Sequence, residues 1–284
     1  MLTTEIQQHR FPIQNGATSL ASVLAVASPT APLLVFAHGF AGNKDENGLF
    51  SEASDYFVDR GFSVLRFDFR ACGENKGAFK AVRLPDLVAD LRNVFAYIES
   101  TPSLQWLPIG FVGFSLGAGI GLLAELRVQA YVFWSPAIYT RTDMVPRYQA
   151  EVKEKGYVIK GDIEVSKDFI GDLSSDIIAD RLRGITAPVL LIHGTADQRI
   201  PYSSTERAFK TLRKKSKDCR ISVISGADHS FRNNVRARRQ LFSTSLEWLQ
   251  RKLPRTVQDH SGQWHNGTHG SLSQPQHDSA EVLI

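Results

Sequence analysis

Short, continuous runs of apolar residues alternate with longer amphipathic segments along most of this chain, and this alternation constrains the fold more than any other feature. Continuous apolar runs are typical of strands in a parallel sheet that is buried on both faces. We expect strands at Leu20–Ala27, Leu33–Ala37, Ser63–Phe69, Ile109–Gly113, Ala130–Trp134, Val189–His193 and Arg220–Ile224, and helices at Leu49–Arg60, Leu84–Glu99, Leu116–Leu126, Tyr202–Lys215 and Val235–Lys252. The pattern predicts an α/β protein with a doubly wound sheet.

One long stretch interrupts this alternation. More than 50 residues separate Trp134 from Val189, which is too many for a single crossover helix. The segment predicts a helix around Val145–Glu154, a hairpin over Val158–Val165 that turns at Gly161-Asp162, and a further helix from about Lys167 to Arg183. Long insertions are commonly functional, so we expect residues 136–186 to form a cap over a site. A structural excursion without contact to substrate is the alternative.

Length and composition exclude several classes of protein. The 284 residues include 43% hydrophobic and 22% charged residues, which is enough apolar material for one folded domain over residues 1–254. The net charge of +4 is too small to indicate a nucleic-acid-binding protein, because such a footprint must also be clustered. Residues 255–284 are rich in Gln, His, Ser and Gly and lack periodicity, so we expect a disordered tail.

Two apolar stretches could be mistaken for membrane or export segments. Leu20–Ala27 resembles a signal-peptide core, but the segment before it contains Glu5 and only one cation, Arg10. Leu107–Ala124 has no charged residue over 18 positions, yet five of these are glycines. We therefore expect no membrane span. The two cysteines, Cys72 and Cys219, are too few for a disulfide framework and indicate reduced thiols in a cytoplasmic protein.

A candidate nucleophile lies in the pentapeptide Gly113-Phe114-Ser115-Leu116-Gly117, between a predicted strand and a predicted helix. A serine at such a strand-to-helix turn is held in a strained backbone geometry, and the flanking residues must be small so that strand and helix can approach. The helix amino terminus behind Ser115 would favour a developing negative charge. The pentapeptide alone is a weak signal, but its position in the chain makes it a strong one.

A candidate acidic residue and a candidate base follow Ser115 along the chain, so that the three residues occur in the order Ser, Asp, His. Asp197 comes just after the strand Val189–His193, and His229 lies on the loop after the last strand. We expect His229 to act as general base and then acid, and Asp197 to fix its tautomer. Asp228 adjoins His229 and cannot easily reach its far ring nitrogen. His38 and His193 stand next to glycines at strand ends, where hydrogen-bonded histidines that stabilise a turn are expected.

An oxyanion hole needs two convergent backbone N–H groups, one after the nucleophile and one from an early strand–helix loop. The loop His38-Gly39-Phe40-Ala41-Gly42-Asn43 follows the strand Leu33–Ala37. The candidate donors are therefore the amides of Phe40 and Leu116.

With these motifs together, the sequence resembles the α/β-hydrolase superfamily. The resemblance is carried by LLVFAHGFAGNKDE (Leu33–Glu46), VLRFDFRACGENKG (Val64–Gly77), GFSLGAG (Gly113–Gly119), APVLLIHGTADQRIP (Ala187–Pro201) and GADHSF (Gly226–Phe231). The branch that looks closest contains capped esterases similar to cinnamoyl and feruloyl esterases and serine-aminopeptidase-like hydrolases. It implies a mostly parallel eight-stranded doubly wound sheet, with a cap inserted after strand 6. It also implies Ser115, Asp197 and His229 as triad and Phe40 and Leu116 as oxyanion donors.

The sequence departs from this family at Ala71, where relatives usually have Gly, and at Asn75, where they usually have Ser. We expect this loop to border the site and to influence which substrate is preferred. The predicted activity is hydrolysis of carboxylic esters through an acyl-enzyme, without a cofactor. A thioesterase, acyltransferase, amidase or peptidase on the same triad, or a non-catalytic binding protein of this fold, are the alternatives. Monomer and homodimer both stay open.

The expected partner is a small-molecule ester. Phe40 and the aromatic residues of the predicted cap, Tyr139, Tyr148, Tyr157 and Phe169, hint at an apolar or aromatic acyl or alcohol group. Basic residues gather late in the domain, at Arg207, Lys210, Arg213, Lys214, Lys215, Lys217, Arg232, Arg236, Arg238 and Arg239. A solvated surface explains them first, and an acidic substrate or protein partner is the alternative. The histidines at 260, 265, 269 and 277 match no standard zinc spacing, so we expect no metal site.

Overall fold

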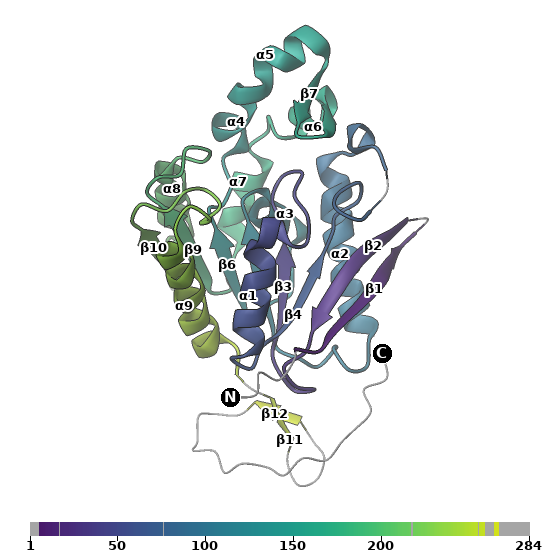
Figure 1. The fold of residues 1–284 in the computed structure, drawn as a ribbon. Coiled ribbons are helices and arrows are strands. Elements are labelled where there is room, and N and C mark those ends of the chain that lie inside the picture. The colour runs from purple at the N-terminus through teal and green to yellow at the C-terminus, as the bar shows by residue number, and fades with distance from the viewer. Residues whose placement is uncertain are drawn as a thin grey trace.

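The computed structural model describes residues 6–16, 18–75, 77–216, 218–254, 256–258 and 264–266. Its centre is an eight-stranded sheet in the order β1-β2-β4-β3-β5-β6-β9-β10 (Figure 1). The strands are β1 (Gln8–Asn15), β2 (Thr18–Ala25), β3 (Leu33–Ala37), β4 (Ser63–Phe67), β5 (Ile109–Phe114), β6 (Ala130–Trp134), β9 (Val189–Gly194) and β10 (Cys219–Ile224). β2 is antiparallel to both of its neighbours, and the strands from β4 to β10 are parallel. This is the predicted mostly parallel α/β-hydrolase fold.

Helices cover both faces of the sheet, as continuous apolar strands require. The helices that cover the two faces are α1 (Leu49–Val58), α2 (Leu84–Ser100), α3 (Leu116–Ala124), α8 (Tyr202–Leu212) and α9 (Val235–Lys252). Helices α1 and α9 share one buried apolar cluster, and α2, α3 and α8 belong to a second cluster across the sheet. Neighbouring residues of one strand alternate between them: Val35 packs in the second cluster, whereas Leu34 and Phe36 pack in the first.

The parallel register brings several loops to one edge of the sheet. Ala37, the last residue of β3, lies beside Gly113 of β5, and Phe114 lies beside Trp134 of β6. Segments that follow these strands therefore emerge together, although they are far apart in the sequence. Ligands of open α/β sheets bind at this carboxyl edge.

The segment between β6 and β9 lies over that edge (Figure 1). It contains α4 (Thr140–Asp143), α5 (Val145–Lys155), β7 (Tyr157–Lys160), β8 (Ile163–Ser166), α6 (Lys167–Asp172), α7 (Ile177–Arg181) and a 3₁₀ turn at Leu182–Gly184. The hairpin β7–β8 forms as predicted. The single helix predicted from Lys167 to Arg183 is wrong, because the chain leaves the helix after Asp172 and starts another at Ile177. In that gap the buried Thr140 hydroxyl donates to the Leu173 carbonyl oxygen.

Strand β1 was not expected from the apolar pattern. It is an edge strand in which only Ile13 is buried, so it has no apolar run to reveal it. In the predicted tail, Thr256–Gln258 (β11) pairs with Trp264–Asn266 (β12). The other residues of the tail lie outside the described residues. Two 3₁₀ turns, Glu46–Gly48 and Phe79–Ala81, complete the described elements. Across the described ranges, no helix combines the length and apolarity that a membrane span needs.

Candidate active site

Ser115 stands at the turn from β5 into α3, in the conformation that the pentapeptide predicted. Its φ of 51° and ψ of −119° lie in a region that residues other than glycine rarely adopt. The backbone is held by its neighbours: the Ser115 N–H donates to the Trp134 carbonyl at 2.9 Å, and the Ser115 carbonyl accepts from Ala137 N at 3.0 Å. The turn exposes the hydroxyl to the cavity above the sheet and places it at the amino terminus of α3.

Small residues on both sides of Ser115 are required by close packing. A Cβ at Gly113 would lie 2.6 Å from Ala118 Cα, which is too close for strand and helix to keep their separation. A Cβ at Gly117 would meet the carbonyl oxygens of Ala37 and His38, the latter at 2.6 Å. The first turn of α3 therefore packs directly against the loop that follows β3.

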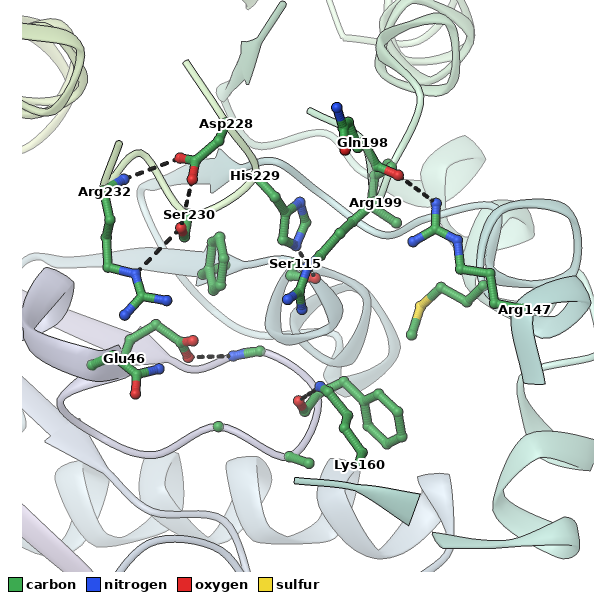
Figure 2. A pocket seen from close by; sticks show the side chains of 18 of the residues that line it. Glu46, Ser115, Arg147, Lys160, Gln198, Arg199, Asp228, His229, Ser230 and Arg232 are labelled. Atoms are coloured by element: carbon green, nitrogen blue, oxygen red, sulfur yellow. Dashed lines mark hydrogen bonds between the residues drawn. The ribbon is translucent and has the colours of Figure 1, made fainter. Parts of the chain in front are cut away.

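The structure brings Ser115, His229 and Asp197 into one hydrogen-bonded chain. His229 Nε2 lies 3.0 Å from Ser115 Oγ, and His229 Nδ1 lies 2.7 Å from Asp197 Oδ2. Figure 2 shows the His229 ring pointing at Ser115 from the loop after β10. Because the Asp197 carboxylate can only accept a hydrogen bond, the neutral His229 ring carries its proton on Nδ1. Its Nε2 is then free to accept the serine proton.

The Asp197 carboxylate is fully buried and accepts hydrogen bonds from several donors. Its Oδ1 accepts from the amides of Arg199 at 2.7 Å and Ile200 at 2.9 Å, and His193 Nε2 lies 3.2 Å from Oδ2. Burial by itself raises the pKa of Asp197, but the hydrogen bonds from His193 and His229 outweigh it and hold the pKa well below its usual value. Burial also lowers the pKa of His229, and Asp197 offsets part of that effect. Asp197 is therefore ionised and His229 neutral near pH 7.

His193 lies beside the Asp197 carboxylate, a contact that the sequence did not predict. It was expected only to stabilise a turn, and its Nε2 does lie 3.0 Å from the Ile200 carbonyl oxygen. The Thr205 hydroxyl lies 2.8 Å from Nδ1. Because Nε2 faces two oxygens and Nδ1 faces a hydroxyl, the proton belongs on Nε2, which can then donate toward Asp197.

The two predicted oxyanion donors lie on adjoining segments. Leu116 is the first residue of α3, where backbone N–H groups have no helical partner. Phe40 lies in the loop after β3, which approaches the nucleophile closely: a Cβ at Gly39 would be 3.3 Å from Ser115 Cβ. The Gly39 N–H donates to Glu46 Oε2 at 2.9 Å, which fixes the loop from the other side.

His38 holds the same loop. Its Nε2 accepts the Phe69 N–H at 3.1 Å, so Nδ1 carries the proton and donates to the Gly39 carbonyl oxygen at 2.9 Å. Burial lowers the pKa of His38 to about 4, so the ring stays neutral in this role. His38 takes part in positioning the loop and does not face Ser115.

A cavity of about 770 Å³ lies over Ser115, and segments far apart in the sequence line it. Charged and polar side chains dominate its walls, as Figure 2 shows: Glu46, Arg147, Lys160, Gln198, Arg199, Asp228, Ser230 and Arg232 surround Ser115 and His229. Lys160 comes from the end of β7, so the inserted segment forms part of the wall. Sequence reasoning missed Glu46, Lys160 and Arg199. Glu46 and Arg199 lie within the motifs Leu33–Glu46 and Ala187–Pro201, but a motif does not show whether a side chain faces the cavity or solvent.

The aromatic residues of the inserted segment mostly pack against protein. Phe169 is fully buried and stacks on Phe40, with ring centres 5.3 Å apart and planes at 7°. Tyr139 is also buried and lies under the Arg207 guanidinium, whereas Tyr157 is exposed. Of the aromatic residues that suggested an apolar substrate, only Phe40 and Tyr148 line the cavity. The aromatic cluster therefore ties the inserted segment to the loop after β3.

Residues 70–75, which were expected to border the site, do not line this cavity. Ala71 has a φ of 54°, a left-handed conformation that the glycine usual in relatives adopts without strain. The Asn75 amide donates to the Asp68 carbonyl at 2.7 Å and accepts the Ala21 N–H at 2.8 Å, so it fastens this loop to β2.

The late basic residues divide among several environments. Arg232 lines the cavity, and Arg238 forms an ion pair with Glu52. Lys217 lies outside the described residues. Within the described ranges, no group of three or more His, Cys, Asp or Glu side chains could hold a metal ion.

Two family models match the chain. The model described as serine aminopeptidase, S33, covers residues 28–177, which is 150 of the 284 residues. The model of the prolyl oligopeptidase family covers residues 148–256. The first match spans the loop after β3 and Ser115, and the second spans Asp197 and His229.

Two curated proteins are similar to the chain over most of its length. A putative phosphoribosyl transferase of Mycobacterium tuberculosis is 26% identical over 216 residues, which are 76% of this chain and 40% of the relative, so the chain matches less than half of its length. A monoacylglycerol lipase of Mycolicibacterium smegmatis is 24% identical, over 82% of this chain and 93% of the lipase.

Among solved structures, Est1E from Butyrivibrio proteoclasticus with bound ferulic acid superposes with a TM-score of 0.69 at 19% identity, covering 84% of this chain and 98% of Est1E. At that identity the likeness concerns the fold. Together with the match to residues 28–177, the site geometry leads to one assignment. The chain belongs to the serine aminopeptidase S33 family and has the α/β-hydrolase fold.

Proposed function

We propose that this protein hydrolyses carboxylic esters through a covalent acyl-enzyme on Ser115. The observation that carries the proposal is the chain of two hydrogen bonds, 3.0 Å from Ser115 Oγ to His229 Nε2 and 2.7 Å from His229 Nδ1 to Asp197 Oδ2. These lengths are those at which a base can take a proton from a nucleophile in one step.

In acylation, Ser115 Oγ attacks the ester carbonyl carbon while His229 Nε2 takes the hydroxyl proton. Asp197 stabilises the imidazolium that forms. The amides of Phe40 and Leu116 donate to the oxygen that becomes negative in the tetrahedral intermediate. The intermediate collapses when His229 returns the proton to the departing alcohol, and the acyl group stays on Ser115.

In deacylation, a water molecule takes the place of the alcohol. His229 removes its proton as it attacks the acyl carbon, and the same two amides stabilise the second oxyanion. Proton return to Ser115 Oγ releases the carboxylic acid and restores the enzyme. Each proton that leaves one oxygen goes to another through His229, so no cofactor is required.

The inserted segment, residues 136–186, is proposed to act as the cap. The contribution of Lys160 and Tyr148 to the cavity wall supports this role. Residues 1–254 would then form the capped hydrolase domain, and residues 255–284 would be an appendage to it.

Amide hydrolysis is the second candidate, because the family model that covers residues 28–177 is described as a serine aminopeptidase. The same triad can cleave esters, thioesters and amides, so matched substrates decide. An ester, a thioester and an anilide with the same acyl group should be compared by kcat/KM. The proposal expects the ester to be preferred over the amide by more than the ratio of their uncatalysed reactivities.

The direct test replaces the nucleophile. Ser115→Ala should lower kcat for a simple ester by at least ~10⁴-fold, since triad members act as a unit. Ser203→Ala, which changes an exposed serine of α8, is the matched control and should retain activity. Ester turnover by Ser115→Ala at the rate of the unmodified protein would contradict the proposal.

A further inference from the structure

The charges around Ser115 indicate what kind of ester the site accepts. We infer that the substrate carries an anionic group, a carboxylate or a phosphate, which Arg199 binds beside the nucleophile with the help of Lys160 and Arg232. The inference rests on the proposed ester hydrolysis and adds the substrate class to it.

Four cationic side chains line the cavity over Ser115: Arg147, Lys160, Arg199 and Arg232. Among the described residues, none of the four has a carboxylate oxygen within 4.0 Å. Two arginines elsewhere are ion-paired: Arg70 lies 2.6 Å from Asp90, and Arg83 lies 2.5 Å from Asp172. The positive charge over Ser115 therefore has no ion-pair partner among the described residues, although a substrate must bind there.

Arg199 has the position that an anion-binding residue needs. Its backbone N–H donates to Asp197 Oδ1 at 2.7 Å, so the residue is anchored to the same carboxylate that holds His229. Its guanidinium has no hydrogen-bond or ion-pair partner among the described residues. Figure 2 shows its side chain extending across the cavity that Ser115 lines, and its charge is close enough to lower the pKa of His229. A free guanidinium presents a planar fork that matches a carboxylate or phosphate.

Lys160 and Arg232 extend the positive surface on other walls. The Lys160 ammonium uses one donor on the Phe40 carbonyl oxygen and keeps two for a ligand. Arg232 donates from Nε to Ser230 Oγ at 3.3 Å, and Figure 2 shows its guanidinium projecting into the cavity above Glu46. Arg147 is further engaged, because its guanidinium donates to the Gln198 carbonyl at 3.0 Å.

The two acidic residues of the cavity, Glu46 and Asp228, can balance at most two of its four positive charges. Glu46 Oε2 accepts the Gly39 N–H, and burial raises the pKa of this carboxyl group. Asp228 accepts the Arg232 N–H at 3.1 Å and the Ser230 hydroxyl at 3.2 Å. Burial, with Arg199 nearby, lowers the pKa of Lys160 to about 8, so most Lys160 side chains are still protonated at pH 7.

The anion can belong to either half of the ester, so the test uses one matched pair for each. For the alcohol half, 3-carboxyphenyl butanoate is compared with its methyl ester, 3-(methoxycarbonyl)phenyl butanoate. For the acyl half, mono-4-nitrophenyl adipate is compared with its methyl ester. In each pair methylation removes the negative charge and adds one methyl group. Release of butanoate or of 4-nitrophenolate is followed, so that cleavage of the methyl ester itself is not counted, and kcat/KM is measured for each compound at pH 7 and low salt.

We expect the anionic member of at least one pair to be preferred by about 10- to 100-fold, since a hydrogen-bonded charge pair contributes on that scale. In Arg199→Gln the preference should fall toward 1, because the backbone N–H to Asp197 is kept while the charge is lost. Arg239→Gln, which removes an exposed arginine from α9, is the matched control and should retain the preference.

Failure of the subsite and failure of the proposed function give different results. Hydrolysis of the neutral esters with no preference for the anionic member of either pair would overturn the subsite alone. Turnover of none of the four esters would point to a failure of the proposed function, and binding then decides the subsite. In Ser115→Ala, titration calorimetry should show tighter binding of an anionic ester than of its methyl ester, and equal affinities would overturn the subsite.

Discussion

The Lys160 ammonium lies 4.2 Å from the centre of the Phe40 ring and donates a hydrogen bond to the Phe40 carbonyl oxygen. Lys160 ends strand β7 of the inserted segment, and Phe40 supplies a proposed oxyanion donor from the loop after β3. Phe169 of the inserted segment also stacks on the Phe40 ring, with the ring centres 5.3 Å apart. The inserted segment and the loop after β3 are therefore joined at Phe40, so the position of one affects the other.

Lys160→Met should impair catalysis through this contact. Methionine keeps an apolar chain of similar length but removes the charge and the donor. The Phe40 carbonyl oxygen then loses its hydrogen bond, and the loop that carries the Phe40 N–H is less firmly held. Losing an oxyanion donor completely costs about 10²–10³ in rate, so a displaced donor should cost about 10-fold in kcat for a neutral ester. Lys153→Met, at an exposed position of α5, is the control. An unchanged kcat in Lys160→Met would show that the contact is not needed.

The pH dependence of kcat/KM should report His229. The pKa of His229 is lowered from 6.5 by burial, although Asp197 opposes that shift. The imidazolium cannot accept the Ser115 proton, so activity is lost as pH falls through this pKa and is fully present above it. For a neutral ester we expect an acid limb with a midpoint below pH 6.5 and a plateau near pH 7. A midpoint at pH 7 or above would contradict this description of the site.

His193 should act as a positioning residue through Asp197, which its Nε2 approaches to 3.2 Å. His193→Leu removes a donor from the carboxylate, whose remaining charge then acts more strongly on His229. We expect kcat/KM to fall about 10-fold and the acid limb to move to higher pH.

His193→Gln, which keeps an N–H donor, should restore part of both effects. A purely structural role would lower the melting temperature without moving the acid limb, and that result would count against the positioning role.

Gly117→Ala should lower stability as well as activity. The added Cβ would meet the backbone oxygens of Ala37 and His38, neither of which can rotate away. Overpacking of this kind costs about 1–3 kcal/mol, which corresponds to a decrease in Tm of several degrees for a domain of this size. Gly184→Ala, where a Cβ would have no neighbour within 4 Å, should melt like the unmodified protein. Equal melting temperatures for the two variants would show that the first turn of α3 can move away from the loop.

Local sequence patterns predicted the parts of the fold and site that depend on local chemistry. The turn at Ser115 needs small neighbours within two residues, and Asp197 and His229 follow apolar strands that end at a common edge. The boundaries of helix α9 and the start of α1, α2, α3 and α8 also agree with the periodicity. Strand β1 was missed because only Ile13 is buried, and its pairing with β2 depends on long-range contacts.

The features that sequence patterns did not predict depend on the direction of individual side chains. Lys160 and Arg199 could face solvent or the cavity, and only the packing of the inserted segment and of the loop after β9 decides this. Phe169 was one of the aromatic residues that hinted at an apolar or aromatic substrate group, but it is fully buried against Phe40. Cationic side chains line the cavity, where the aromatic residues had suggested an apolar lining, whereas the hydrogen bonds among Ser115, His229 and Asp197 follow the predicted pattern.

The central claim is that Ser115 forms a covalent bond to the acyl group or to an analogue of it. The protein should be treated with a fluorophosphonate, digested, and analysed by mass spectrometry, with Ser115→Ala and Ser203→Ala in parallel. We predict one phosphonylated peptide, the one that contains Ser115, in the unmodified protein and in Ser203→Ala, and none in Ser115→Ala. An unlabelled Ser115 in a protein that still hydrolyses esters would contradict the account.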